Sequence, residues 1–171
     1  GVSLETTVVA EGSQAVKISG ASFYKSYSHD LIPASEGKYY RLSVQAAVEN
    51  VSVTPSLSFT FYAADGTTKL AGGSSTLIDL EGTAPYREFA SRYRLAPAGT
   101  AYVKVGVAFA KGNSGAKLYL DEVHLYESAN LPVRLVATYE SISVYVSREA
   151  QIANEVAHVY YREAGSSQWY E

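Results

Sequence analysis

The chain has 171 residues, of which 47% are hydrophobic and 18% are charged, and its formal net charge is −3. This composition is typical of a globular protein, and the small net charge gives no electrostatic footprint for nucleic acid. No apolar run approaches the roughly 20 residues that span a membrane, and the absence of cysteine excludes disulfides and thiolate chemistry. We therefore expect neither nucleic acid nor membrane as a partner.

Almost every periodic segment has the period of a strand, which predicts an all-β protein. The expected strands are residues 6–10, 14–19, 25–32, 38–48, 56–63, 75–80, 86–95, 101–110 and 116–126. Turns rich in Gly and Ser separate them, and no segment has the pattern of an amphipathic helix. Many short strands between turn signals predict a sandwich or a barrel.

The longer strands each have one apolar and one polar face, because side chains alternate along a strand. In residues 38–48 the apolar face begins with Tyr40, Leu42 and Val44. The polar faces of the strands together carry Ser43, Gln45, Thr60, Tyr62, Arg92 and Lys104.

Residues 101–127 carry the clearest alternation of the chain. A Gly/Asn turn at 111–115 separates two alternating runs, which predicts an antiparallel hairpin with one buried face. In the second run the apolar phase slips between Leu120 and Val123. A slip of this kind predicts a bulge or bend, and two carboxylates, Asp121 and Glu122, lie at it.

The composition changes at residues 128–132, which we interpret as a linker between a domain at 1–127 and a segment at 133–171. The segment has expected strands at 133–138, 141–147, 156–162 and 168–170. An immunoglobulin-type sandwich takes about 100 residues, so this segment cannot close a two-sheet core alone. We expect further chain or a partner protein to complete it.

The order of elements in residues 14–127 resembles the carbohydrate-binding modules of the family 4, 9, 16 and 22 type. The matching stretches are Gly12 to Ile18, Ile32 to Val44, Tyr86-Arg87-Glu88-Phe89 and Leu120-Asp121-Glu122-Val123-His124-Leu125. The resemblance implies a jelly-roll β-sandwich with a galactose-binding-like fold. The chain departs from the family at Tyr86, where a Trp is usual, at Glu122, where a second Asp is usual, and in lacking a recognisable first strand.

The resemblance also implies a structural calcium ion, with Asp121 as its candidate ligand. Calcium takes about six to eight oxygen ligands, and adjacent strand residues point to opposite faces unless the bulge redirects one. The alternative is that Asp121 caps a turn or is an exposed charge at the edge of a sheet.

A groove for a glycan is the second site that we expect. Sugar rings have an apolar face that packs on aromatic rings, and their hydroxyls pair with amide and guanidinium groups. The candidate residues are Tyr62, Tyr86, Tyr102, Arg41, Gln45, Arg92 and Lys104. Their basic side chains would favour an acidic polysaccharide. The alternative is a solvated sheet face with ordinary cross-strand pairs.

The C-terminal segment resembles the first half of a fibronectin type III domain. The similarity rests on the Tyr161-Arg162 pair and Trp169 within residues 156–169. Such domains serve mostly as spacers in extracellular bacterial enzymes and in phage structural proteins.

Catalysis is not expected from this chain. His29-Asp30 is the only adjacent pair of a histidine and an acid, and the chain has neither a nucleophile-elbow pattern nor a phosphate-binding glycine loop. We therefore predict a non-catalytic glycan-binding module of a larger extracellular protein. The alternative is a ligand-free structural module of a phage tail, a capsid decoration or a surface appendage.

Overall fold

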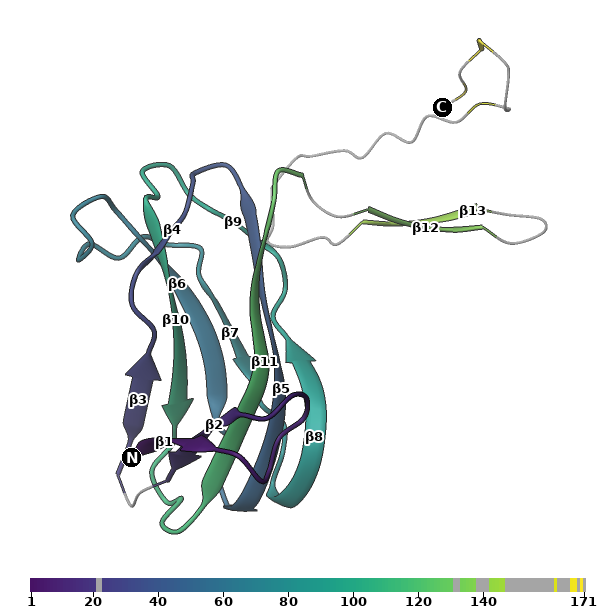
Figure 1. The fold of residues 1–171 in the computed structure, drawn as a ribbon. Coiled ribbons are helices and arrows are strands. Elements are labelled where there is room, and N and C mark those ends of the chain that lie inside the picture. The colour runs from purple at the N-terminus through teal and green to yellow at the C-terminus, as the bar shows by residue number, and fades with distance from the viewer. Residues whose placement is uncertain are drawn as a thin grey trace.

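The computed structural model describes residues 1–20, 23–130, 133–137, 142–146, 162, 167–168 and 170, and contains only strands and loops within them. Two antiparallel sheets are stacked as a β-sandwich (Figure 1). Sheet A consists of β1 (Val2–Glu5), β2 (Ala15–Ser19), β5 (Tyr39–Val51), β8 (Gly82–Ala90), β9 (Arg94–Leu95) and β11 (Lys117–Ser128). Sheet B consists of β3 (Lys25–Ser28), β4 (Ile32–Pro33), β6 (Ser56–Tyr62), β7 (Ser74–Leu77) and β10 (Tyr102–Phe109). The predicted all-β, jelly-roll sandwich is confirmed.

The core lies between the two sheets, where the alternating apolar side chains of each strand meet. On β5 the predicted inward face is confirmed, because Tyr40, Leu42 and Val44 are all buried. Tyr40 packs edge-on against Phe61, with ring centroids 5.5 Å apart, and Phe59 packs similarly against Phe61 at 5.6 Å. Burial of each such ring contributes about 1.5–3 kcal/mol.

The first strand of the chain is not where the sequence pattern placed it. Residues 6–10 form a loop, and the strand is Val2–Glu5, which pairs with β2. The reason is local: the Glu5 carboxylate accepts hydrogen bonds from the backbone N–H groups of Thr6 and Thr7, at 3.1 and 3.0 Å. Side-chain bonds of this kind turn the backbone and compete with a ladder, despite the strand propensity of Thr.

The predicted hairpin of β10 and β11 is wrong, because the two strands belong to different sheets. β10 pairs with β3, β4 and β6, whereas β11 pairs with β2 and β5. Alternation shows only that each strand has one buried face. It cannot distinguish two paired strands of one sheet from two strands that face each other across the core. The turn at 111–115 therefore crosses from one sheet to the other.

Asn113 holds this crossing in place. Its side chain is 1% exposed, and its Oδ1 accepts hydrogen bonds from the N–H groups of Ser52 and Val53 at 2.9 and 3.0 Å. Its Nδ2 donates to the carbonyl oxygens of Val53 and Ala110 at 2.7 and 3.1 Å. One amide thus satisfies four backbone groups at the end of the sandwich.

The predicted bulge in β11 is confirmed. Asp121 lies opposite Gln45 of β5, and the next pair is His124 opposite Ser43, so two residues of β11 face one residue of β5. Glu122, inside the bulge, has a φ of 46°. The bulge therefore changes which side chains the C-terminal half of β11 presents to solvent.

The C-terminal segment is described only in part. The expected strands at 133–138 and 141–147 are confirmed as β12 (Val133–Ala137) and β13 (Ile142–Val146), which pair with each other. The expected strands at 156–162 and 168–170 lie mostly outside the described residues, so the fibronectin-like domain stays a prediction. The described part of the chain contains no helix that could cross a membrane.

We expect Asn113→Ala to lower the free energy of unfolding by about 2–4 kcal/mol, because it leaves several buried backbone groups without partners. Urea denaturation measures this loss. The control is Ser75→Ala at an exposed position of β7, which should change stability by less than about 0.5 kcal/mol. Equal stability of the two variants would contradict the role given to Asn113.

Candidate functional site

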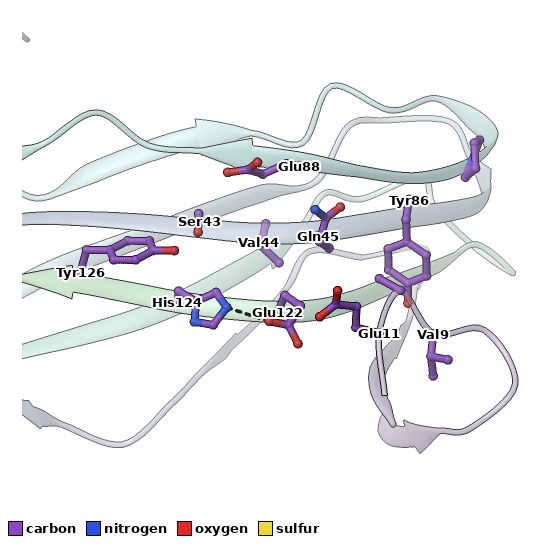
Figure 2. A pocket seen from close by; sticks show the side chains of 12 residues that line it. Val9, Glu11, Ser43, Val44, Gln45, Tyr86, Glu88, Glu122, His124 and Tyr126 are labelled. Atoms are coloured by element: carbon purple, nitrogen blue, oxygen red, sulfur yellow. Dashed lines mark hydrogen bonds and ion pairs between the residues drawn. The ribbon is translucent and has the colours of Figure 1, made fainter. Parts of the chain in front are cut away.

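A cleft of about 680 Å³ opens on the outer face of sheet A (Figure 2). Its floor comes from β5, β8 and β11, and one wall comes from the loop between β1 and β2. The lining residues are Val9, Ala10, Glu11, Ser43, Val44, Gln45, Pro85, Tyr86, Glu88, Glu122, His124 and Tyr126.

The floor is polar because alternate residues of β5 face outward. Ser43 and Gln45 alternate with the buried Leu42, Val44 and Ala46, so their side chains point away from the core. Neighbouring strands add polar groups at the same levels, with Glu88 of β8 opposite Gln45 and His124 of β11 opposite Ser43. Three adjacent strands thus present one continuous polar strip.

The bulge adds Glu122 to this strip. Its Oε2 lies 2.8 Å from Nε2 of His124. An ionised carboxylate can only accept hydrogen bonds, so Nε2 of His124 is the donor in this pair. The His124 ring in turn lies beside the Tyr126 ring, with centroids 5.8 Å apart and planes inclined by 36°. Figure 2 shows the three side chains in a row along β11.

The wall of the cleft is held against sheet A by Asp121. Its Oδ2 accepts hydrogen bonds from the N–H groups of Ala10 and Glu11, at 2.8 and 3.1 Å, and its Oδ1 accepts one from the N–H of Glu122 at 2.9 Å. Tyr86 adds a second anchor, since its hydroxyl donates to the carbonyl oxygen of Val8 at 2.9 Å. The loop is therefore fixed to both β11 and β8.

Two pKa shifts follow from these anchors. Burial alone would raise the pKa of Asp121, but the three N–H groups stabilise its charged form and hold the pKa below the ordinary value. The pKa of Tyr86 is raised to about 12, first by burial and then by the negative charge of Asp121. At neutral pH Asp121 is therefore ionised and Tyr86 is protonated, so both anchoring interactions are kept.

The surroundings of Asp121 do not fit a calcium ion. Its two carboxylate oxygens face three N–H donors, whereas calcium needs further oxygen ligands around it. Within the described residues, no group of three or more His, Asp or Glu side chains could hold a metal ion. The geometry matches the alternative considered for Asp121, a cap on a neighbouring loop, and calcium stays an untested implication of the family resemblance.

The structure places six of the seven residues expected to bind a glycan on the two sheets, three on each, and places Arg92 in the loop between β8 and β9. Gln45 and Tyr86 line the cleft, and Arg41 lies on the same strand face, opposite Tyr126 in the register. Arg92 follows β8 and is exposed. The other three lie on sheet B, where Tyr62 and Tyr102 are cross-strand partners and Lys104 pairs with Thr60.

Most residues of the cleft were not among those expected from the sequence. Glu88, Glu122, His124 and Tyr126 come together because β8 and β11 both pair with β5, and strand alternation carries no information about pairing. One feature of the sequence did indicate this part of β11. The phase slip after Leu120 marks the bulge that puts Glu122 and His124 on the outer face.

Comparison with protein families and curated proteins finds no match for this chain. Solved structures do match over about three-quarters of it. An enzymatically active domain of tailspike protein 4 of bacteriophage CBA120 has a TM-score of 0.60 at 14% identity, covering 75% of this chain and 18% of the tailspike chain. A family 16 carbohydrate-binding module has a TM-score of 0.53 at 15% identity, covering 73% of this chain and 84% of the module.

A third match is the Clostridium thermocellum xylanase 10B, in a structure of its family 22 and catalytic modules with xylohexaose. It has a TM-score of 0.50 at 12% identity and covers 74% of this chain and 24% of the xylanase chain. At these low identities the matches show a shared fold alone, the β-sandwich that the carbohydrate-binding modules also have. The chain spans less than a quarter of the tailspike and xylanase chains that it matches.

We expect Asp121→Asn to destabilise the protein by about 1–3 kcal/mol at pH 7, because an amide cannot accept all three N–H groups. The pKa of Asp121 is lowered on folding, so its carboxylate stabilises the fold above its unfolded pKa of about 3.9, and this contribution is lost as the pH falls further. Urea denaturation of both proteins at pH 7 and pH 3 should therefore show a difference that shrinks at pH 3. A difference independent of pH would contradict the charged cap.

Removal of calcium should leave stability unchanged if Asp121 acts as the loop cap. Thermal unfolding in calcium and in a chelator measures this directly. A bound ion at 100 times its Kd would stabilise the fold by about 2.7 kcal/mol, which raises Tm by several degrees. A rise of that size on adding calcium would restore the expected calcium site.

Proposed function

We propose that this chain is a non-catalytic glycan-binding module, and that the cleft on sheet A is its binding site. The observation that carries the proposal is the cleft itself, in which tyrosines flank a strip of polar side chains. In Figure 2, Tyr126 lies at one end and Tyr86 at the other, with Ser43, Gln45 and Glu88 between them. Its volume of about 680 Å³ lies within the range of ligand pockets, about 300–1,000 Å³.

The arrangement suits a sugar chain for two physical reasons. Tyr126 is 45% exposed, so its ring is open to stack on the apolar face of a sugar. The polar strip beside it follows β5 from Arg41 to Gln45, a span of about 13 Å at the rise of a strand. A linear oligosaccharide can lie along this strip and pair its hydroxyls with Ser43 and Gln45.

The charge of the cleft favours a neutral glycan over the acidic one that the basic residues first suggested. The lining contains Glu11, Glu88 and Glu122 and neither Lys nor Arg, and Arg41, at the end of the strip, lies outside the lining with its guanidinium over the Tyr93 ring. A cleft lined by carboxylates repels an anionic ligand, and the low-dielectric walls concentrate this field. The fold shared with the family 16 module supports a polysaccharide partner, and we place the module in a larger extracellular or virion protein.

The second candidate is a structural module without a ligand. The phage tailspike domain, with a TM-score of 0.60, supports this alternative, because the chain corresponds to a small part of a virion protein there. The two functions differ in one property. A glycan-binding module binds polysaccharide through exposed side chains of the cleft, and a structural module does not.

Affinity electrophoresis in gels that contain mixed-linkage β-glucan, xylan, galactomannan or polygalacturonate tests the proposal. We expect retardation by at least one neutral polysaccharide and none by polygalacturonate. Tyr126→Ala should weaken the binding about tenfold or more, because it removes the exposed aromatic ring on which a sugar would stack.

Tyr62→Ala is the matched control, since it removes a half-buried tyrosine from the other sheet. It should leave retardation unchanged. Loss of binding in Tyr62→Ala but not in Tyr126→Ala would place the site on sheet B. Absence of retardation in all four gels would favour the structural module.

A further inference from the structure

Glu122 occupies a backbone conformation that favours glycine. Its φ is 46°, and among the described residues Asn50, with a φ of 55°, is the only other non-glycine residue with positive φ. Asn tolerates the left-handed region, but a longer side chain such as Glu does so at a cost in stability. Bulges with a left-handed residue usually carry Gly there. The presence of Glu instead of Gly at position 122 therefore requires an explanation.

The fold itself supplies no such reason. The N–H of Glu122 donates to Asp121, and glycine would supply the same N–H. The side chain of Glu122 is 40% exposed, and its contact is with His124, whose side chain is 50% exposed. Exposed pairs of this kind contribute little to stability. The carboxylate therefore does not repay the cost of the backbone conformation through contacts within the protein.

The free hydrogen-bonding groups of this pair point to a ligand. His124 donates to Oε2 of Glu122, and within the described part of the chain no hydrogen bond reaches the other oxygen, Oε1. A neutral imidazole that donates through Nε2 also has an acceptor at Nδ1. The pair thus adds two acceptors to the cleft, next to the exposed ring of Tyr126.

We infer that Glu122, held by His124, is a specificity-determining residue that accepts hydrogen bonds from the hydroxyls of a neutral sugar. This inference rests on the proposed glycan-binding function. Sugar hydroxyls supply the donors that Oε1 and Nδ1 lack, and hydrogen bonds to a charged acceptor are about twice as strong as neutral ones. The carboxylate of a uronic acid has only hydrogen-bond acceptors and the same negative charge as Glu122, so the pair rejects a uronic acid.

Two substitutions of Glu122 separate the cost of its backbone conformation from its contact with the ligand. Glu122→Gly removes the carboxylate and relieves the positive φ, so we expect a higher Tm together with binding to neutral polysaccharide weakened about tenfold, the size of one charge-assisted hydrogen bond. Glu122→Gln keeps the side chain length and removes the charge, and should weaken binding without raising Tm. Binding is measured by affinity electrophoresis on the β-glucan, xylan and galactomannan gels, and Tm by differential scanning fluorimetry.

Asn50→Gly is the matched control, because it relieves a positive φ at an exposed residue outside the cleft. It should leave binding unchanged. If both Glu122 variants bind as tightly as the wild type, the inference is overturned while the glycan-binding function stands. If the wild type binds none of the three polysaccharides, the proposed function fails and this inference fails with it.

Discussion

The three hydrogen bonds that Asp121 accepts determine the shape of the outer face of sheet A. Two of them join the loop between β1 and β2 to the middle of β11, two segments separated by more than one hundred residues in the sequence, and the third comes from the neighbouring N–H of Glu122. The loop lies over the sheet because this buried carboxylate needs N–H donors, and the loop provides two of them. Without the cap, the cleft would lose the wall formed by Val9, Ala10 and Glu11.

The bulge in β11 gives two adjacent carboxylates separate tasks. On a regular strand Asp121 and Glu122 would point to opposite faces, and Glu122 would enter the core. The extra residue avoids this, so Asp121 fixes the loop while Glu122 joins His124 and Tyr126 on the outer face. The bulge that puts Glu122 on the cleft is thus also what forces its backbone into the left-handed conformation.

The sequence predicted well which face of each strand is buried, and predicted poorly which strands pair with each other. Alternation located ten of the strand segments and the inward side chains of β5, because burial of one face leaves a period of two. It could not show that β10 and β11 lie in different sheets, nor that Glu5 turns the chain at Thr6. Because the pairing was unknown, residues expected to form one site lie on different sheets: Gln45 and Tyr86 line the cleft, whereas Tyr62 and Tyr102 are on sheet B.

We propose that the outer face of sheet A, and not that of sheet B, contacts the ligand. A titration of the ¹⁵N-labelled protein with oligosaccharides of a bound neutral polysaccharide, followed by two-dimensional NMR, tests it most directly. We expect the backbone amide signals of Gln45, Glu88 and His124 to shift and saturate together, while those of Tyr62 and Tyr102 stay in place. Shifts confined to Tyr62, Tyr102 and their neighbours would contradict it.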